Sequence, residues 1–314
     1  MAEKQATRDA YGKALVTLGA ENPNVVVLDA DLSKSTKTAE FAKHYPERFF
    51  NMGIAEQNML GTAAGLAAAG KIPFASTFAV FATGRAFEQI RNSIAYPKLN
   101  VKIAATHAGI TVGEDGASHQ AVEDVALMRA LPNMVVLVPA DGEETRQTVL
   151  AAAQHRGPVY IRMGRLDVPR LFGADYRFEI GKANVLRKGK DVAIMANGIM
   201  VAAALEAAEE LAASGIEAGV VNVASVKPLD KETIIRLAAE CQAVVTAEEH
   251  NIIGGLGSAI AEVLAENRPT PMVRVGLKDT FGESGRPAEL LQKYGLTKDD
   301  LIKAVFDVLA KKNG

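Results

Sequence analysis

Short runs of β-branched and other apolar residues alternate with helix-period segments along most of the chain. In the first half, the runs that predict strands cover residues 25–28, 49–52, 72–76, 101–106, 135–139 and 159–163. A helical pattern or a glycine-rich loop follows each run within a few residues. The first helix is expected to bury one stripe made of Ala10, Ala14, Leu15 and Leu18. This alternation predicts a parallel sheet covered by helices on both faces.

The periodic pattern is lost between residues 165 and 190, where turn residues, charges and aromatic residues mix. A second α/β pattern follows, with strands expected at 192–196, 218–223, 244–247 and 272–275 and helices at 199–213, 231–240 and 258–265. Asp230 is placed to cap one of these helices, and Thr297 with Asp300 forms a capping box before the final helix. We therefore expect an α/β protein with two doubly wound domains and mostly parallel sheets, divided as 1–170, a linker at 171–190, and 191–314.

Composition narrows the classes of function. The 314 residues include 35 basic and 37 acidic side chains, so the net charge of −2 offers no general attraction for nucleic acid or an anionic membrane surface. The single cysteine, Cys241, excludes an internal disulfide and any site built on several cysteines. No secretory signal or membrane-spanning segment is evident. These features indicate a cytoplasmic protein with neither nucleic acid nor membrane as a partner.

Polar and aromatic residues gather just after the predicted strands of the first domain. Ligands of open α/β sheets bind beyond the carboxyl ends of the strands, so these residues are candidates for one shared site. Singly, each has an ordinary structural explanation. Glu56 can compensate a helix dipole, and the spacing of His107 and His119 does not suit a metal pair. The candidates in chain order are Asp29, Asp31, Ser33, Ser35, Glu56, Phe78, Phe81, His107, Glu114, Asp115, His119 and Arg162.

Four segments of the first domain resemble the pyrimidine-binding domain of transketolase: DADLSKS (29–35), NMGIAEQNM (51–59), STFAVF (76–81) and THAGITVGEDGASHQAVED (106–124). In the second domain, VKPLD (226–230) and EEHNIIGGLGSAIAEVL (248–264) are similar to the transketolase C-terminal domain. The resemblance covers nearly the whole chain, and the segment 106–124 is its most specific part.

The resemblance implies a site for the pyrimidine end of thiamine diphosphate, a cofactor that breaks carbon–carbon bonds by acting as an electron sink. Glu56 matches the family glutamate that binds a pyrimidine ring nitrogen and favours the imino tautomer. Phe78 and Phe81 match aromatic residues that pack on the pyrimidine. The implied catalytic residues are Glu56, His107 and His119.

The resemblance also implies a site for sugar phosphates. His107 and His119 match histidines that contact sugar hydroxyls, phosphate or the reacting carbonyl, and Asp115 matches an aspartate that binds the C2 hydroxyl of the acceptor. Arg8, Ser35 and Arg162 match a phosphate clamp, although Arg165 can take the place of Arg162. The implied substrate-binding set is Arg8, Asp31, Ser35, His107, Asp115, His119 and Arg162.

A complete transketolase has a further domain that binds the diphosphate through a metal ion held by a Gly-Asp-Gly motif and an asparagine. That motif is not found here, so the chain is expected to be the C-terminal subunit of a split transketolase of the pentose phosphate pathway. A partner chain would then carry the Mg²⁺ ligands, with no metal bound by this chain itself. A tetramer of two copies of each chain is the simplest symmetric assembly. Other interpretations remain open: a deoxyxylulose-phosphate synthase-like or 2-oxoacid dehydrogenase β-like subunit, or a non-catalytic scaffold.

Overall fold

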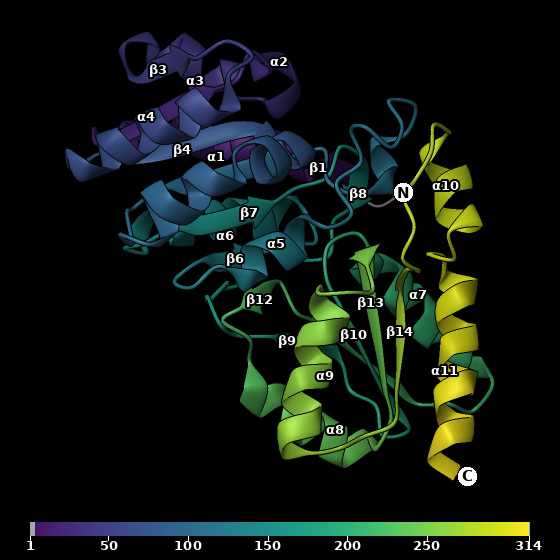
Figure 1. The fold of residues 1–314 in the computed structure, drawn as a ribbon. Coiled ribbons are helices and arrows are strands. Elements are labelled where there is room, and N and C mark those ends of the chain that lie inside the picture. The colour runs from purple at the N-terminus through teal and green to yellow at the C-terminus, as the bar shows by residue number, and fades with distance from the viewer. Residues whose placement is uncertain (1–3, 314) are drawn as a thin grey trace.

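Two layered α/β units make up the structure, a computed structural model that describes residues 4–313 (Figure 1). Six strands of the first unit and one strand that crosses back from the second form a seven-stranded sheet in which all neighbours are parallel except at one edge. The expected mixed fold with mostly parallel sheets is therefore confirmed. In spatial order the strands are β12 (Ser225–Lys227), β6 (Val135–Leu137), β7 (Val159–Arg162), β5 (Lys102–Thr106), β4 (Ile72–Phe78), β2 (Val25–Asp29) and β3 (Phe49–Asn51).

Helices cover both faces of this sheet. One face packs against α1 (Thr7–Glu21), α3 (Ala39–His44) and α6 (Gly142–Gln154). The other packs against α4 (Glu56–Ala68), α5 (Asp124–Ala130) and two π-helical segments, Phe81–Arg85 and Gln89–Ala95. The predicted stripe of α1 is buried, because Ala10, Ala14, Leu15 and Leu18 all face the core. The remaining short elements are α2 (Ser33–Thr36) and the 3₁₀ turns Pro46–Arg48 and Ile110–Val112.

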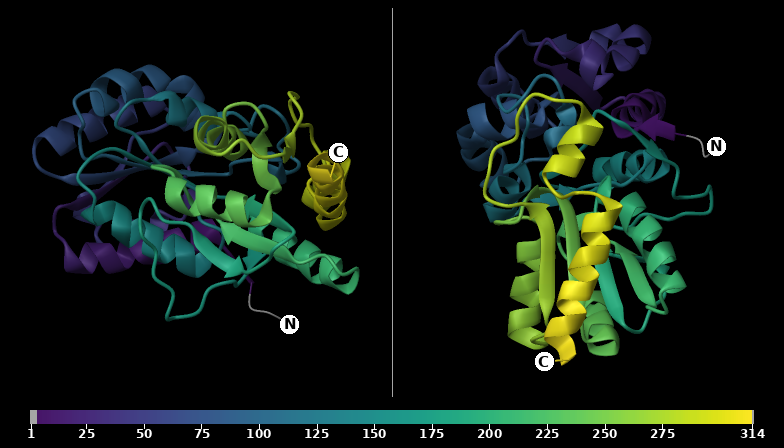
Figure 2. Two further views of the ribbon diagram at one scale, coloured as in Figure 1. Left: turned by 90° about the horizontal axis from the view of Figure 1, so that it is seen from below. Right: turned by 90° about the vertical axis from the view of Figure 1, so that its right-hand side faces the viewer.

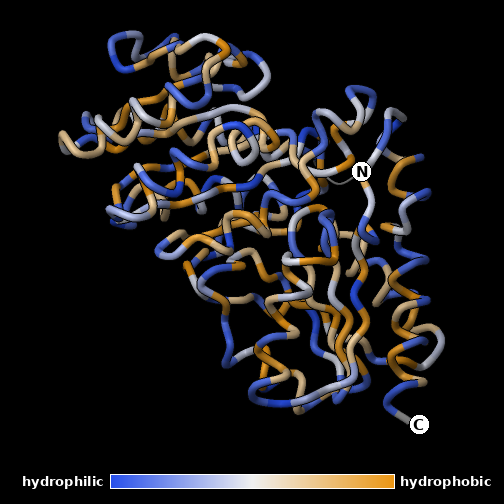
Figure 3. The backbone as a smooth tube through the Cα atoms, viewed as in Figure 1, coloured by the Kyte–Doolittle hydropathy of each residue, from blue (hydrophilic) through white to orange (hydrophobic). Residues whose placement is uncertain are grey.

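The second unit repeats this architecture around a five-stranded sheet. Its two faces are covered by α7 (Met200–Ala213) with α11 (Lys298–Asn313), and by α8 (Lys231–Cys241) with α9 (Leu256–Asn267). Figure 3 shows that hydrophobic residues concentrate in these strands, whereas the loops at the lower end are hydrophilic. The strands in spatial order are β14 (Met272–Leu277), β13 (Val244–Asn251), β10 (Val192–Ala196), β11 (Ala218–Asn222) and β9 (Asn184–Arg187), parallel except for β9.

The predicted helix caps are present. Asp230 Oδ1 accepts a hydrogen bond from Thr233 N at 3.1 Å at the start of α8. At the start of α11, Thr297 N donates to Asp300 Oδ2 at 3.0 Å, and Asp300 N donates to Thr297 Oγ1 at 3.4 Å. Such caps satisfy backbone groups that have no partner within the helix, which fixes where each helix begins.

Some elements lie outside the predicted pattern. The segment expected to be a linker contains β9, which joins the second sheet, and β12 crosses back to pair with β6 of the first sheet. A small antiparallel pair, β1 (Lys4–Ala6) with β8 (Asp167–Pro169), and the helix α10 (Pro287–Lys293) were not expected. These elements are short, and their pairing depends on partners far away in sequence. Across residues 4–313, no helix is long and apolar enough to cross a lipid bilayer.

A buried carboxyl group links the two units. Glu144 of α6 accepts hydrogen bonds from Tyr176 Oη at 2.5 Å, Asn222 Nδ2 at 2.7 Å and Ala140 N at 2.7 Å. Asn222 ends β11 of the second sheet, so the carboxyl group connects elements of both units. Burial raises the pKa of Glu144 to about 7, more than these hydrogen bonds lower it.

Replacing Glu144 should therefore change how stability depends on pH. Because the pKa of Glu144 is raised in the folded state, its contribution to stability is present at low pH and is lost as the pH rises through about 7. In the wild-type protein, Glu144 should lower the free energy of unfolding by about 3 kcal/mol between pH 5 and pH 8. In Glu144→Gln this decrease should be absent, and urea unfolding at the two pH values measures it.

The matched control is Glu143→Gln on the same helix. The Glu143 carboxylate is paired with Arg146, which lowers its pKa, so this variant should keep the wild-type slope between pH 5 and pH 8. An unchanged slope in Glu144→Gln would contradict the assignment.

Candidate active site

Four rings meet beyond the carboxyl ends of β4 and β5. The rings of Phe78 and His107 stack with centroids 3.8 Å apart and planes 22° apart. Phe78 also stacks with Phe81 at 5.8 Å, and His119 meets Phe81 edge-on at 5.3 Å. The structure thus brings together four residues predicted from separate segments of the chain.

Strand register accounts for this meeting. Phe78 ends β4 and pairs in register with Thr106 at the end of β5, so His107 emerges beside Phe78. Phe81 opens a π-helical segment three residues after Phe78. Such segments are rare in proteins and often occur at functional sites. Two parallel neighbouring strands therefore place one aromatic residue and one histidine side by side.

The backbone of His107 adopts a positive φ of 55°, which is uncommon for a residue with a side chain. Its Nε2 lies 3.3 Å from Arg8 Nη1, and its Nδ1 lies 2.9 Å from Thr106 Oγ1. Because a guanidinium only donates, Nε2 is the acceptor, and we infer that the ring proton is on Nδ1. Burial, with the charges of Arg8 and Arg165, lowers the pKa of His107 to about 3, so the ring is neutral near pH 7.

Glu56 lies at the first residue of α4 and is 4% exposed. Its Oε1 accepts from Arg85 Nη1 at 3.0 Å, and the guanidinium carbon of Arg85 lies 4.0 Å from the centre of the Phe81 ring. A flat group with nitrogen donors thus stacks on Phe81 while it binds the Glu56 carboxylate. An aminopyrimidine offers the same combination of a flat face and ring-edge nitrogens, so these residues suit such a ligand.

The predicted residues near the N-terminus lie at the same edge of the sheet. Arg8 Nη1 donates to the main-chain oxygen of Ser35 at 3.1 Å, so this contact leaves the Ser35 hydroxyl unused. Asp31 is exposed, and its Oδ1 accepts from Asn51 Nδ2 at 3.0 Å. Arg8 joins Ser35 to the rings through His107. Asp29, also considered in the sequence, is instead buried and accepts from Leu32 N, Thr36 Oγ1 and Thr38 Oγ1.

The two arginines that were alternatives in the sequence have different environments. Arg165 Nη1 donates to Val112 O and lies 3.9 Å from Asp115 Oδ2, in the loop that carries His119. Arg162 is buried instead, and its Nε donates to Asp124 Oδ2 at 2.9 Å. Its Nη2 donates to the carbonyl oxygens of Ala121 and Glu249. Arg165 is therefore the more accessible of the two, since its side chain is 37% exposed and that of Arg162 is 7% exposed.

Two features of the site had no clear signal in the sequence. Arg85 stands in a segment without a recognisable charge pattern, and its partner Glu56 is 29 positions away. The polar run Glu248, Glu249 and His250 follows a predicted strand, but it is buried as the end of β13 and reaches the first unit. The four-residue spacing of Phe81 and Arg85, which brings a guanidinium over a flat ring, is the signal that could have suggested the first contact.

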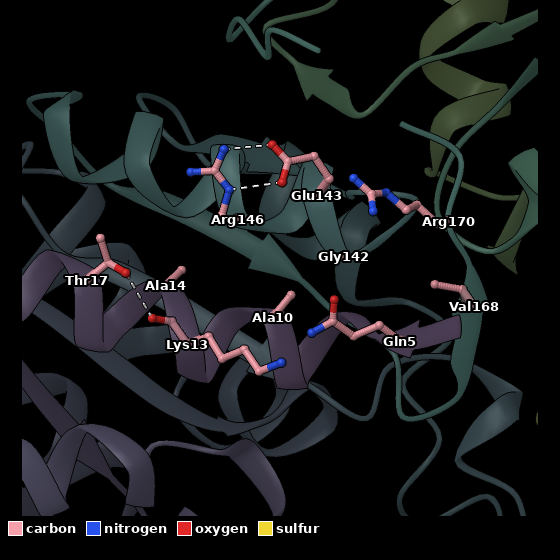
Figure 4. A pocket seen from close by; sticks show the side chains of 10 residues that line it. All are labelled: Gln5, Ala10, Lys13, Ala14, Thr17, Gly142, Glu143, Arg146, Val168 and Arg170. Atoms are coloured by element: carbon pink, nitrogen blue, oxygen red, sulfur yellow. Dashed lines mark hydrogen bonds and ion pairs between the residues drawn. The ribbon is translucent and has the colours of Figure 1, made fainter. Parts of the chain in front are cut away.

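A separate pocket of about 230 Å³ lies between α1 and α6 (Figure 4). Arg146 and Glu143 form a two-point ion pair at its upper rim, and Lys13 extends along the opposite wall. The residues of the ring cluster do not line it. This pocket is therefore distinct from the candidate site.

Comparisons with known proteins agree with the arrangement. Residues 3–170 match the family model described as the transketolase pyrimidine binding domain, and residues 181–301 match the transketolase C-terminal domain. The chain is 53% identical to a "Putative transketolase C-terminal section" of Methanocaldococcus jannaschii, covering 97% of this chain and 96% of that protein. It is 46% identical to a "6-deoxy-6-sulfo-D-fructose transketolase subunit" of a Clostridium species, covering 99% and 97%.

A solved structure described as "Split gene transketolase, inactive beta4 tetramer" superposes with a TM-score of 0.93. That protein is 66% identical in sequence, and the match covers 98% of this chain and 99% of the other. Similarity therefore extends over both units and is not limited to the candidate site.

The low pKa of His107 can be tested on this chain alone. We expect ¹⁵N-edited NMR to show a neutral His107 ring down to about pH 4, because burial and Arg8 oppose its protonation. Arg8→Met should raise the pKa of His107, whereas Arg8→Lys, which keeps the positive charge, should retain more of the depression. A His107 ring that is charged at pH 6 in the wild-type protein would contradict the predicted environment.

Proposed function

The chain belongs to the transketolase family, and on that premise we propose that it is one subunit of a thiamine-diphosphate-dependent transketolase. The reaction would move a two-carbon ketol unit from a ketose phosphate to an aldose phosphate. The observation that carries the proposal is the Glu56–Phe81 pair, which already holds a flat nitrogen-bearing group in the form of Arg85.

Glu56 and Phe81 would hold the pyrimidine end of the cofactor. When bound, thiamine diphosphate supplies a carbanion at its thiazolium ring that accepts and releases the ketol unit. Glu56 would hold a proton at a pyrimidine ring nitrogen, a task that suits a carboxyl group only 4% exposed to water. Phe78 and Phe81 would exclude water from the face of the ring.

His107, His119 and Arg165 would act on the sugar phosphate. A neutral His107 can accept a proton or a hydrogen bond at Nε2 once Arg8 turns to a phosphate. Burial and, to a smaller extent, the nearby charge of Arg165 lower the pKa of Arg8, so the two guanidinium groups lie close together. Two such groups suit phosphate oxygens. Asp115 is exposed beside Arg165, where a substrate hydroxyl can reach it. In this scheme Arg162 does not contact the phosphate. Ser35 would orient Arg8, and Asp31 would orient Asn51.

A partner chain would complete the site. Ile54, two residues before Glu56, is 78% exposed, and Phe50 nearby is also exposed. Apolar side chains beside a functional carboxylate are typical of a surface that another polypeptide covers. The partner would supply the diphosphate-binding domain and the ligands of Mg²⁺. The relatives described as a "section", a "subunit" and a "split gene" product support this division. A tetramer of two chains of each kind remains the simplest closed assembly.

Mixing the chain with such a partner tests the function. With thiamine diphosphate and Mg²⁺, the mixture should transfer a ketol unit from xylulose 5-phosphate to ribose 5-phosphate, and either chain alone should not. Glu56→Gln should lower kcat by about 100-fold or more, because it removes proton transfer at the pyrimidine. Glu47→Gln, on an exposed glutamate, is the control.

The other outcomes distinguish the alternatives. Full activity of the isolated chain would contradict the shared site. Activity with pyruvate as donor, and none with xylulose 5-phosphate, would favour a deoxyxylulose-phosphate synthase-like or 2-oxoacid dehydrogenase-like subunit. Undiminished activity of Glu56→Gln in the complex would favour a scaffold.

The Arg85 contact predicts competition with the cofactor. Arg85 must leave Glu56 and Phe81 before a pyrimidine can bind there, and its side chain is 51% exposed, so the contact is weak enough to exchange. Arg85→Met should tighten thiamine diphosphate binding to the assembled complex by about threefold to tenfold in calorimetric titration. Arg91→Met, a nearby exposed arginine that bonds Asn92, should leave the affinity unchanged. Weaker binding by Arg85→Met would show that Arg85 helps to hold the cofactor.

A further inference from the structure

The end of β13 carries three consecutive buried ionisable residues, Glu248, Glu249 and His250. Buried carboxylates need hydrogen-bond partners, and the two glutamates find theirs in different units. Glu248 accepts from Leu256 N at 2.6 Å and Gly257 N at 2.8 Å, at the start of α9 in its own unit. Glu249 points to the first unit, toward the loop that carries the two histidines.

We call residues 107–120 the histidine loop, since it begins with His107 and includes His119. Glu249 Oε1 accepts a hydrogen bond from Thr111 N at 2.7 Å. Its carboxyl carbon lies 2.2 Å from where a Cβ on Gly109 would be, and Gly109 has a φ of +82°. The Glu249 carboxylate therefore fills the space that a side chain at position 109 would need.

The same strand end also holds Ala121 and Val122, the residues just after the histidine loop, which we call its returning arm. The main-chain oxygen of Glu249 accepts from Arg162 Nη2 at 2.8 Å, and Arg162 Nη2 also donates to Ala121 O at 3.3 Å. Asn251 N donates to Val122 O at 2.8 Å. The end of β13 therefore holds the chain near the beginning of the loop, at Thr111, and just after its end, at Ala121 and Val122.

A second segment of the same unit supports the tip of the loop. Gln120 Nε2 donates to Ile110 O and Gly113 O within the loop and to Glu283 O at 2.9 Å. Pro287 lies against Gly113. Figure 2 shows α10, which begins at Pro287, beside the first unit and away from the body of the second sheet. The second unit therefore contacts the loop at its base and at its tip.

We propose that Glu249 is a positioning residue that holds Gly109 and Thr111 in place and so sets the separation of His107 and His119. It touches neither ring, and it acts through the backbone of the loop. The second unit would contribute to the reaction through this contact. The effect on catalysis rests on the proposed function, whereas the effect on the loop does not.

Hydrogen–deuterium exchange on the isolated chain tests the effect on the loop. In Glu249→Ala the Thr111 amide loses its acceptor, so exchange across residues 107–120 should increase by about tenfold or more. Glu249→Gln keeps an oxygen acceptor and should restore most of the protection. Glu248→Ala is the matched control, and its increase should be confined to the start of α9.

A double-mutant cycle supports the test if Glu249→Ala unfolds. Gly109→Ala should displace the carboxylate and loosen the loop, and Gly109→Ala combined with Glu249→Gln should show non-additive exchange, because the two positions share one space. Additive effects in the cycle, or unchanged loop exchange in a folded Glu249→Ala, would overturn the proposal.

Kinetics of the reconstituted complex distinguish positioning from general stability. Glu249→Ala should raise KM for both sugar phosphates by about tenfold, with a smaller fall in kcat and unchanged thiamine diphosphate affinity, because the cofactor residues Glu56 and Phe81 lie outside the loop. Equal losses in Glu248→Ala and Glu249→Ala would overturn the positioning role. Loosened loop exchange in Glu249→Ala without ketol transfer by the wild-type complex would leave the positioning role in place and overturn the proposed function.

Discussion

The buried ion pair between Arg162 and Asp124 joins the parts of the molecule on which the site depends. Arg162 ends β7, Asp124 begins α5, and the same guanidinium donates to the main-chain oxygen of Glu249 at the end of β13. Tyr160 adds a hydrogen bond to Asp124 Oδ2 at 2.6 Å. Removing one partner of a buried pair commonly costs about 3–5 kcal/mol, because the other charge is left without a counter-charge. The two units and the returning arm of the histidine loop therefore keep a fixed relation.

The two halves of the candidate site differ in how firmly they are held. Backbone hydrogen bonds, glycines that admit no side chain and contacts from the second unit restrain the histidine loop. The Glu56–Phe81 half is more open, since Arg85, the partner of Glu56, is half exposed and Ile54 beside Glu56 is open to solvent. A rigid half suits substrates that are bound and released in each turnover. An exchangeable half suits a large cofactor that is held together with a second polypeptide.

Local pattern was sufficient to predict the strands of the first unit and the caps at Asp230 and Thr297, because strand periodicity and capping depend on residues close in sequence. The ring cluster also followed from sequence, since Phe78 and His107 each come at the end of a parallel strand. The same rule was insufficient for Arg162, the last residue of β7, and Arg165, which follows three residues later. Asp124, 38 positions away, decides that Arg162 is internal, and only the fold reveals that distance. The strand predicted at 244–247 ended before Glu248 and Glu249 for the same reason, because the burial of these carboxylates depends on their donors Gly257 N and Thr111 N.

A neutral histidine between two guanidinium groups indicates why the loop must be rigid. The pKa of His107 is lowered first by burial and then by Arg8 and Arg165, and these effects change with small displacements. If the loop moved outward, water would reach the ring and the arginine charges would act less strongly, so the ring would protonate more readily and lose its acceptor at Nε2. A contact that fixes Gly109 and Thr111 therefore preserves the protonation state of His107 as well as its position. Geometry and acid–base character in this loop depend on the same buried carboxylate, and that carboxylate belongs to the other unit.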